Sequence, residues 1–211
     1  MLRMPVRAEA SVLPPLVGLV LVGGQSRRMG APKWALDYHG EPQALRMARL
    51  LAAVCERVAV SAAAPVPGLP DLPVVLDSVP VRGPSAGILS ALAAYPDAAL
   101  LVVACDLPLL NAETLAILVQ ERDASCLATA FRSPRDGSPE PLCAVWEPRA
   151  QAGLLAAALA GQSCPRRFLL DADRDGASSE GVALVEAPDP RALTNANTPA
   201  DRAAVLATLA L

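Results

Sequence analysis

Short apolar runs alternate along the chain with segments in which apolar residues recur every three or four positions. Runs of the first kind are typical of buried strands, and segments of the second kind of helices packed on a sheet. Positions 98–104 (AALLVVA) contain no polar residue, as expected for a central parallel strand that is covered on both faces. The pattern predicts strands at 16–22, 57–62, 74–76, 98–104, 126–131 and 142–146, and helices at 42–55, 84–95, 148–160, 199–209 and directly after Asn111.

This alternation predicts an open α/β sheet, mostly parallel, with helices on both faces and therefore three layers. In such sheets ligands bind beyond the carboxyl ends of the strands. Two loops at such ends, after Val22 and after Ala104, combine that position with unusual polar residues. Residues 1–15 contain three prolines and are expected to form a flexible N-terminal extension, followed by a single domain at 16–211.

Composition excludes several classes of protein. With 53% hydrophobic and 18% charged residues, the chain is not disordered as a whole. A formal net charge of −3 argues against a nucleic-acid binder that depends on a basic stripe. The apolar run at 16–22 is too short to cross a bilayer and is followed by no A-x-A cleavage site, so neither a membrane anchor nor a signal peptide is expected.

Cysteine and histidine usage narrows the chemistry further. None of the five cysteines lies in a C-x-x-C pair, and His39 is the single histidine, so we expect neither a zinc site nor a Ser-His-Asp triad. The odd cysteine count favours buried, reduced thiols in a cytoplasmic protein.

The loop at 23–33 (GGQSRRMGAPK) combines three glycines, a serine and three basic residues directly after the first strand. Glycines allow backbone N–H groups to approach an anion closely, and Arg28 and Lys33 add positive charge. The spacing fits neither G-x-G-x-x-G nor the P-loop. The loop therefore predicts a phosphate site of another type.

Two acidic residues also follow predicted strands. Asp106 ends the buried strand in the sequence ACDLP, where a carboxylate faces the ligand crevice and can hold Mg²⁺, or where it can simply form the turn before Pro108. Asp77 follows the strand at 74–76 and has the same two interpretations. Between them, Gly83-Pro84-Ser85-Ala86-Gly87 forms a suitable helix start with proline in the first turn.

Taken in order, these motifs resemble a known family. The sequence G-G-x-S-x-R-M-G-x-x-K after an N-terminal strand is similar to the nucleotide-binding signature of the MobA-like nucleotidyltransferases, which include the molybdenum cofactor guanylyltransferases. G-P-x-x-G, C-D-x-P, P-L-x-A at 141–144 and N-x-N-T-P-x-D at 195–201 follow in the family's order, with Val22 in place of the family's Ala and Ala200 in place of its Glu. The resemblance covers about residues 16–210 and implies a Rossmann-like fold.

The resemblance also implies site residues. It assigns nucleotide binding to Leu21, Gly23, Gly24, Lys33, Asp77, Gly83, Gly87 and Asp106, catalytic roles to Arg28, Lys33 and Asp106, the metal to Asp106, and acceptor binding to Arg166, Asn195 and Asn197. Simpler explanations stay open for two of these regions. Arg166 can lie on a solvated helix turn, and Thr198, Pro199 and Asp201 read as helix-capping residues.

The reaction implied is the magnesium-dependent transfer of GMP from GTP to molybdopterin, which releases pyrophosphate and forms the guanine dinucleotide cofactor. Gly23-Gly24 and C-D-L-P favour GTP, because cytidylyltransferase relatives tend to have Ala-Gly and G-D-x-P at these positions. The alternatives are a molybdenum cofactor cytidylyltransferase, a sugar-phosphate nucleotidyltransferase and a catalytically silent nucleotide-binding module. Molybdoenzymes or other cofactor-biosynthesis proteins are further partners that the resemblance suggests.

Overall fold

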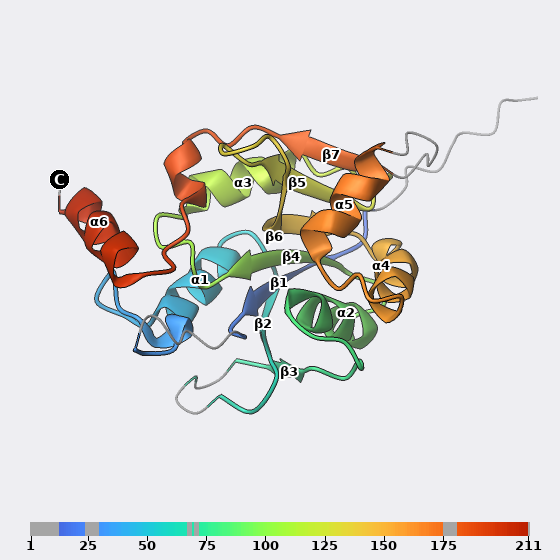
Figure 1. Cartoon of the computed structure of the whole chain (residues 1–211), viewed down its shortest axis with the longest axis horizontal. Helices are drawn as coiled ribbons and strands as arrows, with labels where there is room; N and C mark the ends of the chain where they lie inside the picture. The colour runs from blue at the N-terminus through green and yellow to red at the C-terminus, as the bar shows by residue number, and fades with distance from the viewer. Residues whose placement is uncertain (1–12, 24–29, 67–68, 70–71, 175–180, 211) are drawn as a thin grey trace, which may run out of the picture.

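One mixed sheet organises the chain. The computed structural model describes residues 13–23, 30–66, 69, 72–174 and 181–210, and over this part seven strands pair in the order β3-β2-β1-β4-β6-β5-β7 (Figure 1). Only β6 runs against its neighbours β4 and β5; all other pairs of described strands are parallel. The strands are β1 (Leu16–Leu21), β2 (Arg57–Ala62), β3 (Val74–Leu76), β4 (Ala99–Ala104), β5 (Ala128–Arg132), β6 (Pro139–Trp146) and β7 (Val182–Val185).

Helices cover both faces of this sheet. Helices α1 and α3 pack on one face and α2, α4 and α5 on the other, whereas α6 packs in a small separate cluster with Leu36 and Tyr38. The described helices are α1 (Gln43–Ala52), α2 (Pro84–Ala94), α3 (Ala112–Gln120), α4 (Ala150–Leu159), α5 (Pro165–Arg174) and α6 (Pro199–Leu209), with short 3-10 turns η1 (Lys33–Ala35) and η2 (Pro190–Leu193). The predicted three-layer, mostly parallel α/β fold is confirmed.

The central strand β4 shows how the sequence builds this core. All six of its residues are buried. Leu101 and Val103 contact the core under α1 and α3, while Leu100 and Val102 contact the core under α2 and α4. A strand that is buried on both faces needs apolar side chains at every position, which explains the absence of alternation in its sequence.

The helix at 43–52 differs from the sequence prediction in the face it buries. We expected Leu45, Ala48, Leu51, Ala52 and Cys55 to line one inward face. In the structure Leu45 is only partly buried and Ala52 is exposed, whereas Gln43, Ala44 and Met47 are buried with Ala48 and Leu51. The helix also ends before Cys55. Leu51, which lies on both the predicted and the observed inward face, packs against Gly18 of β1, where an added Cβ would lie 2.9 Å from Leu51 Cβ.

Three other boundaries also differ. The strand β7 was not predicted, although its sequence VALV is a short apolar run, and its four residues are all only partly buried. The helix α5, which was not among the predicted helices, begins at Pro165, so Arg166 and Arg167 lie in its first turn. Strand β6 begins at Pro139 although prolines lack the N–H of a ladder bond. Its register with β4 covers only 143–146, so neither Pro139 nor Pro141 is needed as a donor to β4.

The described part of the N-terminal region is attached to the domain. The carbonyl of Pro15 accepts a hydrogen bond from Ala99 N (2.9 Å), and that of Pro14 accepts one from Arg122 Nη1 (2.8 Å). Residues 1–12 lie outside the described ranges. Among the described helices, none is long and apolar enough to cross a membrane.

All five cysteines are free thiols. Burial raises the pKa of Cys55 and of Cys143 to about 12, and that of Cys105 further. The expectation of buried thiols is wrong for Cys126, which is half-buried, and for Cys164, which is exposed.

Candidate active site

Two adjoining cavities open at the edge of the sheet where β1, β2 and β4 end. The larger has a volume of about 840 Å³, a size typical of small-molecule sites. Its lining includes Leu21, Val22, Gly23, Lys33, Ser61, Ala62, Ala63, Asp77, Arg82, Gly83, Pro84, Gly87, Ala104, Cys105, Asp106, Leu142 and Asn197. Lys33, Asp106 and five other predicted nucleotide-binding residues therefore line one cavity, although they are far apart in the sequence. The five are Leu21, Gly23, Asp77, Gly83 and Gly87.

The second cavity, of about 570 Å³, lies toward β6 and α5. The predicted acceptor residues Arg166, Asn195 and Asn197 all line it. The two cavities share part of their walls, formed by Arg82, Gly83, Pro84, Asp106, Leu142 and Asn197. Ligands held in the two cavities would therefore meet beside Asp106 and Asn197.

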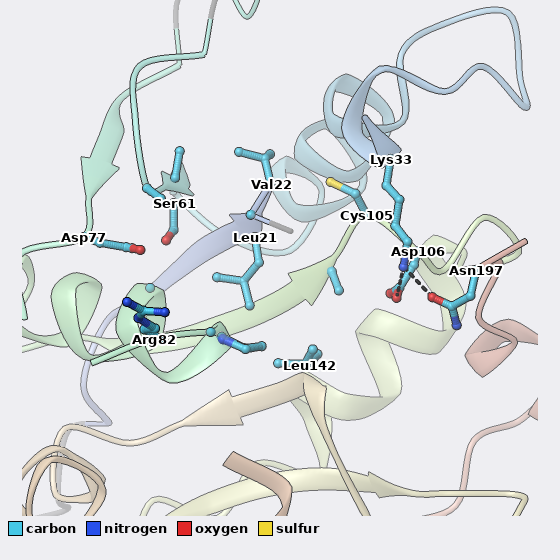
Figure 2. A pocket seen from close by; sticks show the side chains of 17 residues that line it. Leu21, Val22, Lys33, Ser61, Asp77, Arg82, Cys105, Asp106, Leu142 and Asn197 are labelled. Atoms are coloured by element: carbon cyan, nitrogen blue, oxygen red, sulfur yellow. Dashed lines mark hydrogen bonds and ion pairs between the residues drawn. The ribbon is translucent and has the colours of Figure 1, made fainter. Parts of the chain in front are cut away.

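A three-residue polar cluster lies at this junction (Figure 2). Lys33 Nζ forms an ion pair with Asp106 Oδ2 at 3.0 Å and donates a hydrogen bond to Asn197 Oδ1. The three side chains come from η1, from the turn after β4 and from the segment before α6, and they point toward one another (Figure 2). The backbone reinforces the arrangement, since Ala196 N donates to the carbonyl of Asp106 (2.9 Å). The ammonium group of Lys33, which follows β1 in the chain, thus contacts two residues, Asp106 and Asn197, that each line both cavities.

Asp106 keeps one carboxylate oxygen available. Oδ2 is taken by Lys33, whereas Oδ1 is buried and has no hydrogen-bond partner among the described residues. An unpaired carboxylate oxygen is the hard ligand that Mg²⁺ or another divalent cation prefers. Within the described ranges no group of three or more His, Cys, Asp or Glu side chains could hold a metal. The donor set therefore fits a cation that is completed by phosphate oxygens and water.

The start of α2 lies close to the sheet at the floor of the larger cavity. Gly83, the N-cap residue, has φ of +79°, a left-handed conformation that favours glycine. At Gly87 an added Cβ would overlap Ser61 Oγ and lie 3.1 Å from Leu21 Cδ2. Gly87 is therefore required by packing, and the cavity wall it forms depends on that packing.

Asp77 and Arg82 lie across the larger cavity from the Lys33 cluster (Figure 2). Asp77 follows β3, and partial burial raises the pKa of its carboxyl. Sequence reasoning did not single out Arg82, nor Ser61 at the end of β2, as site residues. The sequence offered one signal for each: Arg82 is a basic residue directly before Gly83-Pro84, and Ser61 is a polar residue in an otherwise apolar part of β2.

The three residues predicted to bind the acceptor all form hydrogen bonds with neighbouring residues. Arg166 donates from Nη2 to Glu140 Oε2 (2.7 Å) and from Nη1 to Ser138 Oγ (2.9 Å), so it lies in the cavity wall with defined partners rather than on a freely solvated turn. Asn195 Oδ1 accepts from Arg135 Nη2 at 2.7 Å. Asn197 lines both cavities, so its position alone does not separate donor from acceptor. Glu140 was another site residue not singled out from the sequence.

The capping explanation for 198–201 is confirmed alongside these contacts. Thr198 and Asp201 form a capping box at the start of α6, and Pro199 is in its first turn. Asp201 Oδ2 also accepts from Asn197 N (2.8 Å), so the cap fixes the backbone from which the Asn197 side chain reaches Lys33. Two predicted site residues, Gly24 and Arg28, lie outside the described residues.

Comparison with known proteins agrees with the fold and with the sequence motifs. Residues 18–176 match the MobA-like NTP transferase domain. A probable molybdenum cofactor guanylyltransferase from Natronomonas pharaonis is 34% identical over 87% of this chain and 93% of its own length. A molybdenum cofactor biosynthesis bifunctional protein from Synechocystis is 38% identical over 75% of this chain, which spans about half (47%) of that relative.

Solved structures show the same fold. Molybdopterin-guanine dinucleotide biosynthesis protein A from Archaeoglobus fulgidus aligns with a TM-score of 0.72 at 20% identity, covering 92% of this chain and 98% of its own. A nucleotidyl transferase from Methanothermobacter aligns with a TM-score of 0.71 at 22% identity, covering 92% of this chain and 99% of its own. The resemblance that the motifs carried is thereby confirmed, and the chain belongs to the family of MobA-like NTP transferase domains, a family of nucleotidyltransferases.

Proposed function

We propose that this protein transfers GMP from GTP to molybdopterin, with release of pyrophosphate and with Mg²⁺ as its metal. The observation that carries the proposal is the pair of cavities that meet at Lys33, Asp106 and Asn197, because a group-transfer enzyme must hold two substrates with their reacting atoms adjacent. The guanylyltransferase names of the similar proteins support the choice of substrates.

In this proposal the larger cavity binds GTP. Its triphosphate lies toward Lys33 and Gly23, and its nucleoside extends across the cavity toward Asp77, Gly83 and Gly87. Lys33 neutralises phosphate charge as a compact cation. Arg28 and Gly24, from the same loop, are proposed to contribute to the triphosphate site on the strength of the sequence motif alone.

Asp106 would hold the Mg²⁺, through the oxygen that Lys33 leaves unpaired. The cation, when bound, would neutralise and orient the phosphate oxygens around the reacting phosphorus. Lys33 then has two functions. It holds the Asp106 carboxylate in place before substrates bind, and it counters the charge on the leaving pyrophosphate.

The chemical step needs no protein nucleophile. An oxygen of the terminal phosphate of molybdopterin forms a bond to the α-phosphorus of GTP, and the bond from that phosphorus to the bridging oxygen of the β-phosphate breaks. Pyrophosphate leaves with that electron pair. Positioning and charge neutralisation supply most of the rate enhancement in such displacements. Asn197, at the wall shared by the two cavities, orients Lys33 beside the reacting phosphates.

The remaining assignments follow from the same proposal. Free thiols are consistent with a cytoplasmic protein. Residues 16–211 would act as one catalytic domain, with residues 1–15 as an extension. Molybdoenzymes that receive the product are natural partners, and neither nucleic acid nor membrane is required.

A nucleotide panel tests the function. Purified protein is incubated with Mg²⁺, molybdopterin and either GTP, CTP or ATP, and both pyrophosphate and the dinucleotide product are measured. We expect turnover with GTP and near-background rates with CTP and ATP, because a site whose polar groups pair with guanine leaves them unpaired when another base enters.

The control variant is Asp106→Asn, which keeps the shape of the side chain and removes its charge. It should lose nearly all turnover and keep its unfolding transition. Equal use of CTP and GTP would support the cytidylyltransferase alternative, and tight GTP binding without product would support the silent module.

A further inference from the structure

Glu140 occupies an unusual position in the wall of the second cavity. It stands between Pro139 and Pro141 at the start of β6. Because β6 runs against β4 and β5, its first residues lie at the same edge of the sheet as the carboxyl ends of the parallel strands. The antiparallel direction of β6 therefore places the carboxylate of Glu140 at the edge of the sheet where the cavities open. Its side chain is 13% exposed.

The two oxygens of the Glu140 carboxylate differ in their hydrogen bonding. Oε2 accepts a hydrogen bond from Arg166 Nη2 at 2.7 Å, whereas Oε1 is buried and has no partner among the described residues. Arg166 is held in turn by Ser138 Oγ at 2.9 Å and by Asp136 Oδ2 at 3.5 Å. Leaving a buried charged acceptor without a donor is costly, and such groups are rare in native proteins. An ion pair that served only to attach α5 to β6 would not require a residue of the cavity wall to keep a buried carboxylate oxygen without a donor.

The ligand group that satisfies Oε1 must be a hydrogen-bond donor. An ionised carboxylate accepts only, and its negative charge repels a phosphate. The phosphate end of an acceptor bound in this cavity is therefore directed away from Glu140, toward the junction where Lys33 lies. The opposite end of the acceptor must present N–H groups.

We propose, on the basis of the function proposed above, that Glu140 determines specificity for the pterin ring of the acceptor, by accepting at Oε1 from the ring's 2-amino group and the adjacent N–H. Arg166 is the positioning residue. It fixes the carboxylate through Oε2 and so leaves Oε1 to the ligand. The acceptor then lies with its pterin between β6 and α5 and its phosphate at Asp106.

The substitution Glu140→Gln gives an unusually sharp test. The guanidinium of Arg166 can only donate, so the new amide keeps its oxygen on Arg166 and turns its NH₂ group to the place of Oε1. That exchanges an acceptor for a donor at one point of the cavity. A ligand with oxygen in place of the 2-amino group should then become the better one.

The probes are pterin-6-carboxylate and lumazine-6-carboxylate, which differ in that 2-amino group. Their binding is measured by quenching of their own fluorescence, without GTP. We expect the parent protein to prefer the pterin by about tenfold or more, as is typical when a charge-assisted hydrogen bond is lost. Glu140→Gln should abolish or invert this preference and leave GTP affinity unchanged. A preference for pterin that survives in Glu140→Gln, or an equal loss for both probes, would overturn the proposal.

The matched control is Glu186→Gln, which makes the same change in another Arg–Glu pair, with Arg132, on a side chain that is 77% exposed and lines neither cavity. It should leave both affinities at their parent values. Should Glu140→Gln fail to fold, Glu140→Asp withdraws the carboxylate by one methylene and should reduce pterin binding selectively. Turnover of GTP with molybdopterin in the parent protein is measured in parallel, so failure of the proposed function is distinguished from failure of the Glu140 assignment.

Discussion

Replacing Gly87 by alanine should separate packing from ligand binding at the floor of the larger cavity, which is proposed to bind GTP. The new Cβ would overlap Ser61 Oγ and lie 3.1 Å from Leu21 Cδ2 and 3.3 Å from Ser61 Cβ. Both neighbours are buried, so the relief available is a rotation of the serine hydroxyl or a shift of α2 away from β1 and β2. Overpacking of this kind costs about 1–3 kcal/mol. The higher helix preference of alanine offsets roughly 0.5–1 kcal/mol of that cost.

We therefore expect Gly87→Ala to lose about 1–2 kcal/mol of unfolding free energy, measured by urea denaturation. It should also weaken GTP binding, because the shifted helix start forms the cavity wall. Adding Ser61→Ala removes the overlapping oxygen and should restore about 1 kcal/mol, which is visible as a coupling energy in a double-mutant cycle. Strictly additive effects of the two substitutions would refute the packing argument. Weaker GTP binding at unchanged stability would instead indicate direct contact between Gly87 and the nucleotide.

Three other substitutions test further contacts. Lys33→Ala should weaken GTP binding by about ten- to a hundredfold, the usual loss for a charge-assisted contact, in a calorimetric titration; unchanged affinity would assign the loop another role. Asn197→Ala should weaken acceptor binding and affect GTP only slightly, through its hydrogen bond to Lys33, and the reverse order in titrations of the two ligands would contradict the assignment. Glu147→Ala leaves Arg122, 5% exposed, without its bidentate partner, and should cost about 3–5 kcal/mol, or roughly 6–20 °C in Tm; a shift of under 2 °C would contradict this.

The sequence predicted correctly those elements with a clear local signal, such as a wholly apolar run or a helix-capping residue. Strand β4 is apolar throughout because both of its faces are covered, and α3 begins where Asn111 caps it, with Asn111 Oδ1 2.8 Å from Thr114 N. The prediction was wrong where burial is uneven along an element. Helix α1 buries Gln43, Ala44 and Met47 rather than Leu45 and Ala52, and β7 is a half-buried edge strand that pairs with β5.

The candidate site likewise contains residues that the sequence predicted and residues that only the structure identified. Lys33, Asp106 and Asn197 belong to local motifs, so their chemistry was visible in the sequence. The loops at the carboxyl ends of the strands, together with the resemblance, also predicted that Lys33 and Asp106 share one site. The hydrogen bond from Lys33 to Asn197, which lies 164 positions further along the chain, was not predicted. Arg82 and Glu140 were not singled out from the sequence. In the structure Arg82 lies in the wall shared by the two cavities, and Glu140 lines the second cavity and pairs with Arg166.

The hydrogen bond from Lys33 to Asn197 has a consequence for synthesis of the protein on the ribosome. All strands of the larger cavity, and both charged members of the cluster, are translated well before position 197. Loop closure over that many residues is slow compared with local folding. The nascent domain can therefore form its sheet while Lys33 still lacks its hydrogen bond to Asn197. Assembly of the segment 194–209, with Arg202 bonded to the carbonyl of Asp37 and lying over the ring of Tyr38, is the event that completes the cluster. Catalytic competence would then appear later than the compact fold itself.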